Sequence, residues 1–243
     1  MYLTIDAGNT RTKAVVYDAA GLTWDSITAE GNELAPIKEL IRRHSVEHVI
    51  VSTTGVREWK LSELGIKGKN IELSHEVPLP ISIVYTTPET LGRDRIAAAC
   101  GAKANHPGKN CLVISAGTCM TMDMLLGSGV YLGGNIAPGL RMRLQAMHEY
   151  TARLPLVEPG HPDLPFGDST VHALQNGAGL GMVMEIEGIF QRAKNAFGEV
   201  LIVMTGGDAV FLADRIESQI FVAPELVTQG LFQIIDFNVK TTY

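Results

Sequence analysis

One stretch of the chain is echoed at about half its length, and this echo constrains the fold more than any other feature. Residues 5–10 (IDAGNT) resemble residues 114–119 (ISAGTC), 109 positions further along a chain of 243 residues. In each copy a short apolar run leads through a glycine-containing turn into a second strand-like run. The echo predicts two similar lobes that each present a strand–turn–strand hairpin. Because binding sites favour domain interfaces, we expect a ligand in the cleft between the lobes.

The hydrophobic pattern of both halves alternates between strand-like and helix-like segments, which is typical of an α/β fold. In the first half we expect strands at residues 2–6, 11–18, 22–28, 46–52 and 81–85, and helices around 34–41, 56–64 and 88–104, with Asn32 capping the first. In the second half we expect strands at 111–115, 118–125, 130–137, 200–204 and 219–222, and helices at 139–150, 168–196, 209–215 and 224–235. This order predicts a βββαβαβα unit that occurs twice. The polar, turn-rich residues 105–110 place the boundary between an N-terminal lobe, residues 1–107, and a C-terminal lobe, residues 108–243.

The composition argues against several classes of protein. Asp and Glu outnumber Lys and Arg by 26 to 20, so the chain lacks the basic balance of a general nucleic-acid binder. No run reaches the roughly 18 apolar residues of a membrane helix, and no basic segment precedes the first apolar run as in a signal peptide. The three cysteines form no Cys-x-x-Cys pair, which fits a reducing compartment. We therefore expect a cytoplasmic protein that binds neither nucleic acid nor membranes.

The first repeated turn has the chemistry of a phosphate-binding loop. Gly8 and Asn9 tolerate the left-handed backbone of a tight turn, which points successive N–H groups outward as an anion nest. Thr10 adds a hydroxyl donor, and Lys13 returns a positive charge on the next strand. Asp6 supplies a hard oxygen at the end of the strand, where Mg²⁺ would bridge phosphates. An ordinary hairpin with an exposed aspartate and lysine is the alternative that this spacing leaves open.

Two further glycine turns suit a nucleotide. Gly117 and Thr118 form the related turn in the second half of the chain. Gly206 and Gly207 lie between an expected strand and an expected helix, where paired glycines let the backbone approach a flat ligand such as adenine. A plain strand-to-helix turn is the alternative at this third position.

An unusual acidic residue lies between two arginines. Gly92 falls inside the helix expected from Pro88, where glycine costs about 1 kcal/mol relative to alanine, so another group is expected to approach closely there. Asp94, between Arg93 and Arg95, has the neighbours that would keep a general base ionised. An ion-pair cluster on a helix surface is the alternative.

At these motifs the sequence resembles the type III pantothenate kinases, members of the acetate and sugar kinase, Hsp70 and actin superfamily. The resemblance covers essentially the whole chain, and its most specific motifs are Asp6-x-Gly8-Asn9-Thr10-x-x-Lys13, Tyr85 with Thr87-Pro88-Glu89-x-x-Gly92-x-Asp94-Arg95, Gly117-Thr118-x-x-Thr121-x-Asp123, and Gly133-Gly134-x-Ile136-x-Pro138-Gly139. It implies an α/β fold of two ribonuclease-H-like lobes in the actin/Hsp70-like ATPase architecture. It also implies ATP-dependent phosphorylation of pantothenate to 4′-phosphopantothenate, the first step of coenzyme A biosynthesis.

The resemblance implies a role for each motif. The residues that it implies for ATP and its phosphates are Asp6, Gly8, Asn9, Thr10, Arg11, Lys13, Gly117, Thr118, Gly206 and Gly207. Asp94 matches the acceptor of the proton from the pantothenate hydroxyl. The residues that it implies for the pantothenate pocket are Tyr85, Gly92, Arg93, Asp94, Arg95 and Thr170, with Arg95 a natural partner for the substrate carboxylate. Members of the family are homodimers that complete this pocket across their interface.

The implied cofactors are Mg²⁺, held at Asp6, and a monovalent cation, K⁺ or NH₄⁺. At one position the chain departs from the family pattern. The family has an aspartate before x-Gly-Thr as a ligand of the monovalent cation, and this chain has Ser115. A neutral hydroxyl holds K⁺ less well than a carboxylate, so we expect a site that is weak, shifted to neighbouring carbonyl groups, or absent.

Three other functions compete with a pantothenate kinase. One is a kinase or phosphatase on the same scaffold that acts on a sugar, acetate or polyphosphate, because a fold does not fix the substrate. The spacing of Tyr85 and Asp94 favours pantothenate over these. Another is a non-catalytic accessory factor linked to transcription, against which the presence of Asp94 and Lys13 counts. The third is an ATP-binding but inactive chain, for which Ser115 is the argument.

Overall fold

The computed structural model of the protein describes residues 1–8, 11–31, 33–55 and 59–241, and these form two compact units. The first unit contains Met1–Pro107, Gly129–Tyr131 and Glu225–Tyr243. The second contains Gly108–Ser128 and Leu132–Pro224. The C-terminal segment therefore belongs to the same unit as the N-terminal strands.

The first unit is built on a five-stranded sheet with the order β3-β2-β1-β4-β5. Its strands are β1 (Tyr2–Ala7), β2 (Arg11–Tyr17), β3 (Thr23–Glu30), β4 (His48–Thr53) and β5 (Asn70–Glu72). The three N-terminal strands form antiparallel hairpins, as their Gly and Asn turns predict, whereas β4 and β5 run parallel to β1. Strand β5 is a short edge strand that the hydrophobic pattern does not predict.

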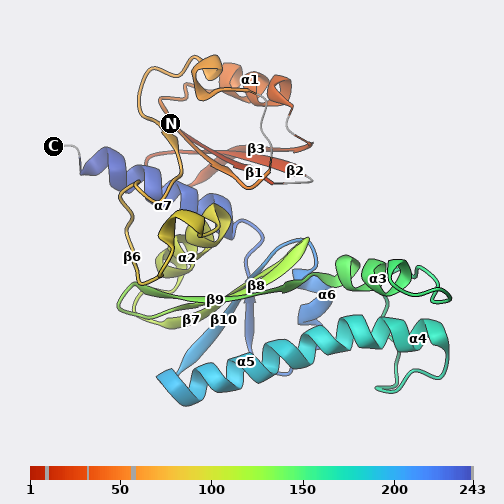
Figure 1. Ribbon diagram of the computed structural model, residues 1–243. Helices are drawn as coiled ribbons and strands as arrows, with labels where there is room; N and C mark the ends of the chain where they lie inside the picture. Colours follow the sequence, from red (N-terminus) through yellow and green to blue (C-terminus); the bar gives the residue numbers. More distant parts are fainter. Residues whose placement is uncertain (9–10, 32, 56–58, 242–243) are drawn as a thin grey trace. The chain divides into compact units, whose positions relative to one another are not determined.

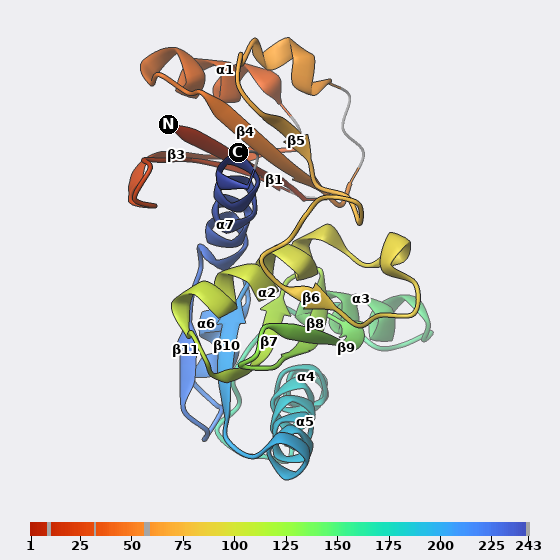
Figure 2. The same ribbon diagram turned by 90° about the vertical axis from the view of Figure 1, so that its left-hand side faces the viewer.

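Helices cover both faces of this sheet (Figures 1 and 2). Helix α1 (Leu34–Arg43) buries Ile37 and Leu40 against the face that carries Leu3 and Ile5. Helix α7 (Leu226–Lys240) packs on the other face, together with helix α2 (Arg93–Asn105). Alternation along β1 thus sends Asp6 to the face of α7, because Asp6 follows the buried Ile5.

Helix α2 begins later than the sequence predicts. Pro88–Thr90 form one separate 3₁₀ turn, η2, and the α-helix begins at Arg93 with Gly92 as its N-cap residue. The expectation that Gly92 lies inside a helix is therefore wrong. A second 3₁₀ turn, η1 (Leu61–Leu64), occupies part of the middle helix expected around residues 56–64. Residues 56–58 and the expected cap Asn32 lie outside the described residues.

The second unit contains the strands β11-β10-β7-β8-β9 of a second sheet. These strands are β7 (Asn110–Ala116), β8 (Cys119–Leu125), β9 (Val130–Pro138), β10 (Val200–Thr205) and β11 (Ile220–Val222). The first residues of β9 pair with β6 (Ser82–Ile83), and both of these short segments group with the first unit. As in the first unit, the strand that leads into the repeated turn pairs antiparallel with the next strand and parallel with a later one.

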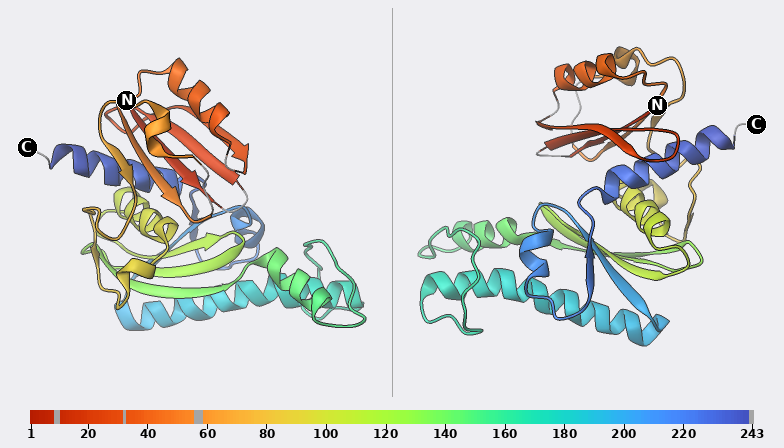
Figure 3. Two further views of the ribbon diagram at one scale, coloured as in Figure 1. Left: turned by 45° about the horizontal axis from the view of Figure 1, so that its top comes forward. Right: turned by 180° about the vertical axis from the view of Figure 1, so that it is seen from behind.

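Helices of the second unit cover one face of its sheet (Figure 3). They are α3 (Leu140–Glu149), α4 (Thr170–Gln175), α5 (Gly181–Phe197) and α6 (Ala209–Ala213). Met120, Met122 and Met124 point into this core, as their alternation predicts. The long helix expected from residue 168 or 169 to about 196 is capped by Ser169 and interrupted by the π-helical turn η3 (Asn176–Leu180). Across the part of the chain that the structure describes, no helix is long and apolar enough to cross a membrane.

Candidate functional site

The candidate residues of the first unit start from a row of polar side chains across its sheet. Asp6, near the end of β1, pairs in register with Lys13 on β2 and with Ser52 on β4. Residues paired across neighbouring strands share a face, so all three lie on the face that α7 covers. The row therefore places a carboxylate between an amine and a hydroxyl.

The carboxyl of Asp6 is in an unusual electrostatic environment. Burial raises its pKa to about 7, and the charge of Asp94 raises that pKa as well. Lys13 and the hydroxyl of Ser52 lower the pKa but do not compensate for burial. Oδ1 of Asp6 is buried and has no hydrogen-bond partner among the residues that the structure describes. A buried acidic oxygen without a partner is costly, and a bound cation would satisfy it.

Lys13 is held by a residue that the sequence did not single out. Its Nζ lies 2.5 Å from Oε1 of Glu225, at the N-terminal end of α7. The other oxygen of Glu225, Oε2, accepts a hydrogen bond of 3.2 Å from the hydroxyl of Thr228. Tyr17 donates to the same hydroxyl over 3.1 Å. The partner of Lys13 is therefore itself fixed in place.

The turn after β1 is described only in part. The backbone N–H of Gly8 donates to the carbonyl oxygen of Arg11 over 3.0 Å, which closes the turn. The side chain of Arg11 begins β2 and is exposed. Asn9 and Thr10, expected in the phosphate loop, lie outside the described residues.

The N-terminal end of α2 carries the expected general base and its neighbours. Asp94 lies in the first turn, where the helix dipole favours a negative charge, and its Oδ1 would be 2.7 Å from a Cβ added to Gly92. This close approach explains the glycine, although it occurs at the cap and not inside the helix. The influence of Asp94 on the pKa of Asp6 shows that the two carboxylates are near one another.

The two arginines beside Asp94 differ in their surroundings. Arg95 is 4% exposed, and its guanidinium carbon lies 6.0 Å from the centre of the Tyr85 ring. Arg93 is partly buried, and its Nε donates to the carbonyl oxygen of Leu73 over 3.1 Å. The structure therefore brings Tyr85, Arg95 and Asp94 to one end of α2.

In the second unit, the glycine turns come together at the ends of the strands. The N–H of Asp208 donates to the carbonyl oxygen of Ala116 over 3.0 Å, which joins the turn of Gly206 and Gly207 to the turn of Gly117. Gly206 has a φ of +101°, and a Cβ there would lie 2.3 Å from the same carbonyl oxygen, whereas a Cβ on Gly207 would meet open space.

The family motif from Gly133 to Gly139 also reaches these turns. The N–H of Gly139 donates to the carbonyl oxygen of Thr118 over 3.1 Å, and a Cβ on Gly139 would lie 2.1 Å from the carbonyl oxygen of Gly117. A Cβ on Gly134 would lie 2.4 Å from Oδ1 of Asp123. Both glycines are thus required by close backbone approach.

Ser115 occupies the position in the second unit that corresponds to Asp6 in the first. It pairs with Thr121 on β8 and with Thr205 on β10, as Asp6 pairs with Lys13 and Ser52. The row that contains two charged groups in the first unit is a row of three hydroxyls in the second. Asp123 is 2% exposed, so the face that it shares with Thr121 is not a solvated one.

Thr170 is the first residue of α4 and is exposed. Ser169 caps the helix by accepting a hydrogen bond of 3.2 Å from the N–H of His172. The side chain of Asn176, in η3, donates over 2.7 Å to the carbonyl oxygen of Leu164 and so fastens the preceding loop to the helix.

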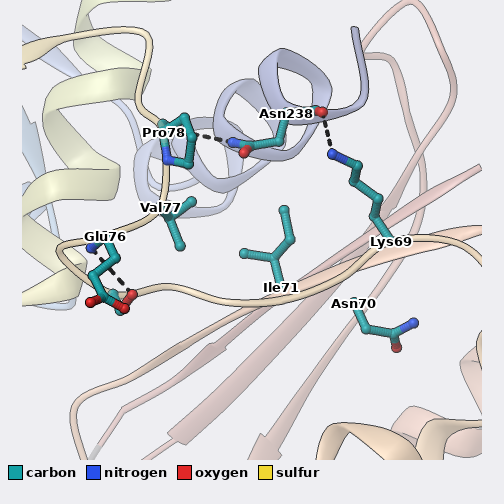
Figure 4. A pocket seen from close by; sticks show the side chains of 8 residues that line it. Lys69, Asn70, Ile71, Glu76, Val77, Pro78 and Asn238 are labelled. Carbon is teal, nitrogen blue, oxygen red and sulfur yellow. Dashed lines mark hydrogen bonds between the residues drawn. The ribbon is translucent and has the colours of Figure 1, made fainter. Parts of the chain in front are cut away.

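A hollow of about 340 Å³ in the first unit is distinct from these groups (Figure 4). It is lined by Lys69, Asn70, Ile71, Ser74, Glu76, Val77, Pro78 and Asn238. Nζ of Lys69 donates to the carbonyl oxygen of Asn238 over 2.5 Å, and Nδ2 of Asn238 donates to that of Pro78 over 2.8 Å. Its polar groups are thus engaged by the protein itself, unlike Oδ1 of Asp6.

Sequence reasoning missed Glu225, Ser52 and Thr53. Glu225 has no neighbouring motif, and its role depends on the return of α7 to the first unit. Ser52 and Thr53 end a strand that the sequence does predict, at the same level as the end of β1. Polar residues at the end of a buried parallel strand were the signal that could have identified them.

Comparison with known proteins agrees with this arrangement. Residues 2–192 match the profile of a family described as type III pantothenate kinase. A curated type III pantothenate kinase from Flavobacterium johnsoniae is 39% identical over 243 residues, which cover 98% of this chain and 99% of the relative.

Two solved structures share the fold at low identity. An activator of 2-hydroxyisocaproyl-CoA dehydratase from Clostridium difficile, with bound ADPNP, matches with a TM-score of 0.56 at 12% identity, over 100% of this chain and 97% of that one. A ROK family glucokinase from Streptomyces griseus, in complex with glucose and AMPPNP, matches with a TM-score of 0.51 at 15% identity, over 97% and 98% of the two chains. The expected α/β class with its actin/Hsp70-like architecture is confirmed. Since both the family profile and the curated relative span most of the sequence, the chain belongs to the type III pantothenate kinase family.

Proposed function

We propose that this protein transfers the γ-phosphoryl group of ATP to the hydroxyl of pantothenate and so forms 4′-phosphopantothenate and ADP, the first step of coenzyme A biosynthesis. The observation that carries the proposal is the pair of carboxylates in the first unit. Asp6 lies in a row with Lys13, and Asp94 lies close enough to influence its pKa. A kinase needs both a place for the charge of the phosphates and a base for the acceptor hydroxyl.

Asp94 is the proposed proton acceptor. As the pantothenate oxygen bonds to the γ-phosphorus and the bond to ADP breaks, the hydroxyl proton passes to the carboxylate of Asp94. Its place in the first turn of α2 favours the ionised form before transfer. General bases of this kind typically contribute about 10²–10⁴-fold to the rate.

The nucleotide would be bound by the glycine turns and Lys13. In the first unit, Gly8, Asn9, Thr10 and Arg11 belong to the proposed phosphate loop, and Lys13 supplies a positive charge behind it. In the second unit, the proposed ligands are the Gly117–Thr118 turn for phosphate and the Gly206–Gly207 turn for adenosine. The open space above Gly207 supports this last assignment, because a flat ring can approach the backbone there.

Asp6 fits a divalent cation. Its Oδ1 is buried without a hydrogen-bond partner among the described residues, and a carboxyl whose pKa is raised to about 7 lacks a compensating positive charge. Mg²⁺, when bound, would neutralise charge on the transferred phosphates. The role of Asp6 is to hold this charge at the end of β1.

The monovalent cation is proposed to bind weakly. Ser115, Thr121 and Thr205 offer three neutral hydroxyls in a row, and hydroxyl oxygens suit K⁺ or NH₄⁺ without the charge of a carboxylate. We expect activation by K⁺ only at concentrations higher than a carboxylate site would need.

The proposed pantothenate residues are Tyr85, Gly92, Arg93, Arg95 and Thr170. Arg95 supports this assignment, because its nearly buried guanidinium lies beside the Tyr85 ring and the Asp94 helix turn. Such a cation is suited to the carboxylate of pantothenate. Gly92 keeps the space beside Asp94 free of a side chain.

We further propose that the protein is a cytoplasmic homodimer. Large apolar side chains are exposed on the second unit, including Tyr150 (87%), Phe166 (86%) and Leu164 (61%). Exposed apolar side chains near one another in sequence suit a protein interface, and Thr170 follows them directly.

A coupled assay of ADP release tests the function. Purified protein is supplied with Mg-ATP, with and without pantothenate, and with and without K⁺ or NH₄⁺. Pantothenate-dependent ADP is the expected result. A folded protein that binds ATP but releases no such ADP under any salt would overturn the proposal and favour an inactive or accessory relative.

A further inference from the structure

Two buried polar atoms on neighbouring strands lack hydrogen-bond partners. They are Oδ1 of Asp6 on β1 and Oγ of Ser52 on β4, and neither has a partner among the residues that the structure describes. The whole of Ser52 is 0% exposed, so solvent does not satisfy its hydroxyl. A buried hydroxyl without a partner is unfavourable and is rare in native proteins.

The two atoms belong together. Asp6 and Ser52 are direct partners in the parallel register of β1 and β4, so their side chains lie on the same face. Ser52 is also close enough for its hydroxyl to lower the pKa of Asp6, although the geometry leaves both atoms outside any hydrogen bond. The next residue on β4, Thr53, has a third buried hydroxyl without a described partner. Unsatisfied oxygens thus gather where β1 and β4 end.

We propose that Ser52 is a positioning residue for the divalent cation, and that its hydroxyl together with Asp6 binds the waters of the hydrated ion. The inference rests on the proposed function, because it takes the cation of the kinase as the missing partner. Mg²⁺ usually keeps several waters and is bound through one or two carboxylates, so it needs hydrogen-bonding groups next to the carboxylate. Ser52 is the neighbouring hydroxyl that is both buried and unoccupied by the protein.

The same face of the sheet provides a control. Thr4 lies two residues before Asp6 on β1 and is also 0% exposed. Its hydroxyl donates to the carbonyl oxygen of Val15 over 3.4 Å, so it already has a partner. Thr4→Val therefore removes a buried hydroxyl from the same face without touching the proposed site.

The test measures Mn²⁺ binding to the full chain without pantothenate, from the electron paramagnetic resonance signal of free Mn²⁺, with and without a non-hydrolysable ATP analogue. For Ser52→Ala we expect an affinity for Mn²⁺ that is lower by about 10-fold or more, the effect typical of residues that orient metal ligands. The melting temperature without metal should not fall, because an unsatisfied hydroxyl has been removed. Thr4→Val should leave the affinity within about twofold and lower the melting temperature.

Two results would overturn the inference. One is an unchanged Mn²⁺ affinity in folded Ser52→Ala. The other is a loss of metal-free stability in Ser52→Ala with unchanged metal affinity, which would make Ser52 a structural residue. If Ser52→Ala does not fold, Ser52→Cys, which keeps the size but not the hydroxyl, replaces it under the same criteria.

The readout separates this inference from the function itself. Wild-type protein that forms no ADP with pantothenate, but loses Mn²⁺ affinity in Ser52→Ala, would overturn the proposed reaction and leave the metal role of Ser52 standing. Wild-type protein that is an active kinase, with Mn²⁺ binding indifferent to Ser52, would overturn only the inference.

Discussion

Nζ of Lys13 lies 2.5 Å from Oε1 of Glu225, so the proposed phosphate-binding lysine is paired with a carboxylate of the same unit. The lysine side chain is 28% exposed and that of the glutamate 42%, which leaves the pair within reach of solvent. Glu225 is fixed at the N-terminal end of α7 by its bond with Thr228. A phosphate that approaches Lys13 would therefore meet a like charge that does not move away easily.

Removing this charge should improve nucleotide binding. For Glu225→Gln we expect the KM for Mg-ATP to fall by up to about fivefold, the equivalent of the roughly 1 kcal/mol that a partly exposed ion pair is worth. The KM for pantothenate should stay unchanged. Glu39→Gln, which breaks an exposed pair with Arg42 of 3.2 Å on α1, is the matched control. A higher KM for Mg-ATP in Glu225→Gln would mean that the glutamate orients Lys13 instead of competing for it.

The pKa of Asp6 predicts how stability depends on pH. Burial raises this pKa from its ordinary 3.8 to about 7, so the folded protein holds the proton more tightly than the unfolded chain. The free energy of unfolding of the metal-free protein should therefore fall as the pH rises from about 4 to about 7, by roughly 2–4 kcal/mol, and then level off.

Asp6→Asn should remove this loss. Urea unfolding in the presence of a chelator, at pH 5 and at pH 8, gives the comparison. The variant should be more stable than wild type at pH 8 and similar at pH 5. Parallel pH profiles for the two proteins would contradict the assignment.

The paired glycines of the second unit predict two different defects. Gly206 has a φ of +101° and no room for a Cβ, so Gly206→Ala should cost about 1–3 kcal/mol and lower the melting temperature by roughly 2–10 °C. Gly207 has open space, so Gly207→Ala should melt within about a degree or two of wild type. It should nevertheless raise the KM for ATP several-fold, because the added methyl fills the proposed adenosine surface. Calorimetry and nucleotide kinetics on both variants check this, and an unchanged KM in Gly207→Ala would remove the turn from the ATP site.

The hydroxyl row around Ser115 predicts a gain of function. Ser115→Asp adds a carboxylate next to Thr121 and Thr205, and a carboxylate binds K⁺ better than a hydroxyl does. The K⁺ concentration that gives half-maximal activation should fall about fivefold or more. ADP release titrated with KCl at constant ionic strength measures it, with Thr4→Val as a control. Identical K⁺ dependence in wild type and variant would place the cation elsewhere.

The N-terminal hairpins and the glycine turns could be predicted because each depends on local chemistry. Residues 5–10 and 114–119 carry their turn residues in the sequence itself, and the structure gives both the same antiparallel pairing. Met120, Met122 and Met124 follow the period of a strand and reach the core. Short-range patterns of this kind need no information about distant segments.

Other features depended on distant contacts or small balances. Helix α7 joins the first unit through packing on β1 and α2, and nothing in residues 226–240 indicates which sheet they cover. The start of α2 moved from Pro88 to Arg93 because Pro88–Thr90 close a separate 3₁₀ turn. The orphaned hydroxyl of Ser52 became visible only when its register with Asp6 was known. Sequence alone therefore identified most candidate residues but not the partners that tune them.

The central claim is that Asp94 takes the proton of the pantothenate hydroxyl, and one measurement tests it most directly. Pantothenate-dependent ADP formation is compared in wild type and Asp94→Asn, with ATP affinity measured on both by calorimetry and the exposed Asp163→Asn as control. We predict a kcat lower by about 10²–10⁴-fold in Asp94→Asn, with ATP affinity within about twofold of wild type. A kcat near that of wild type in a folded Asp94→Asn protein would contradict the account.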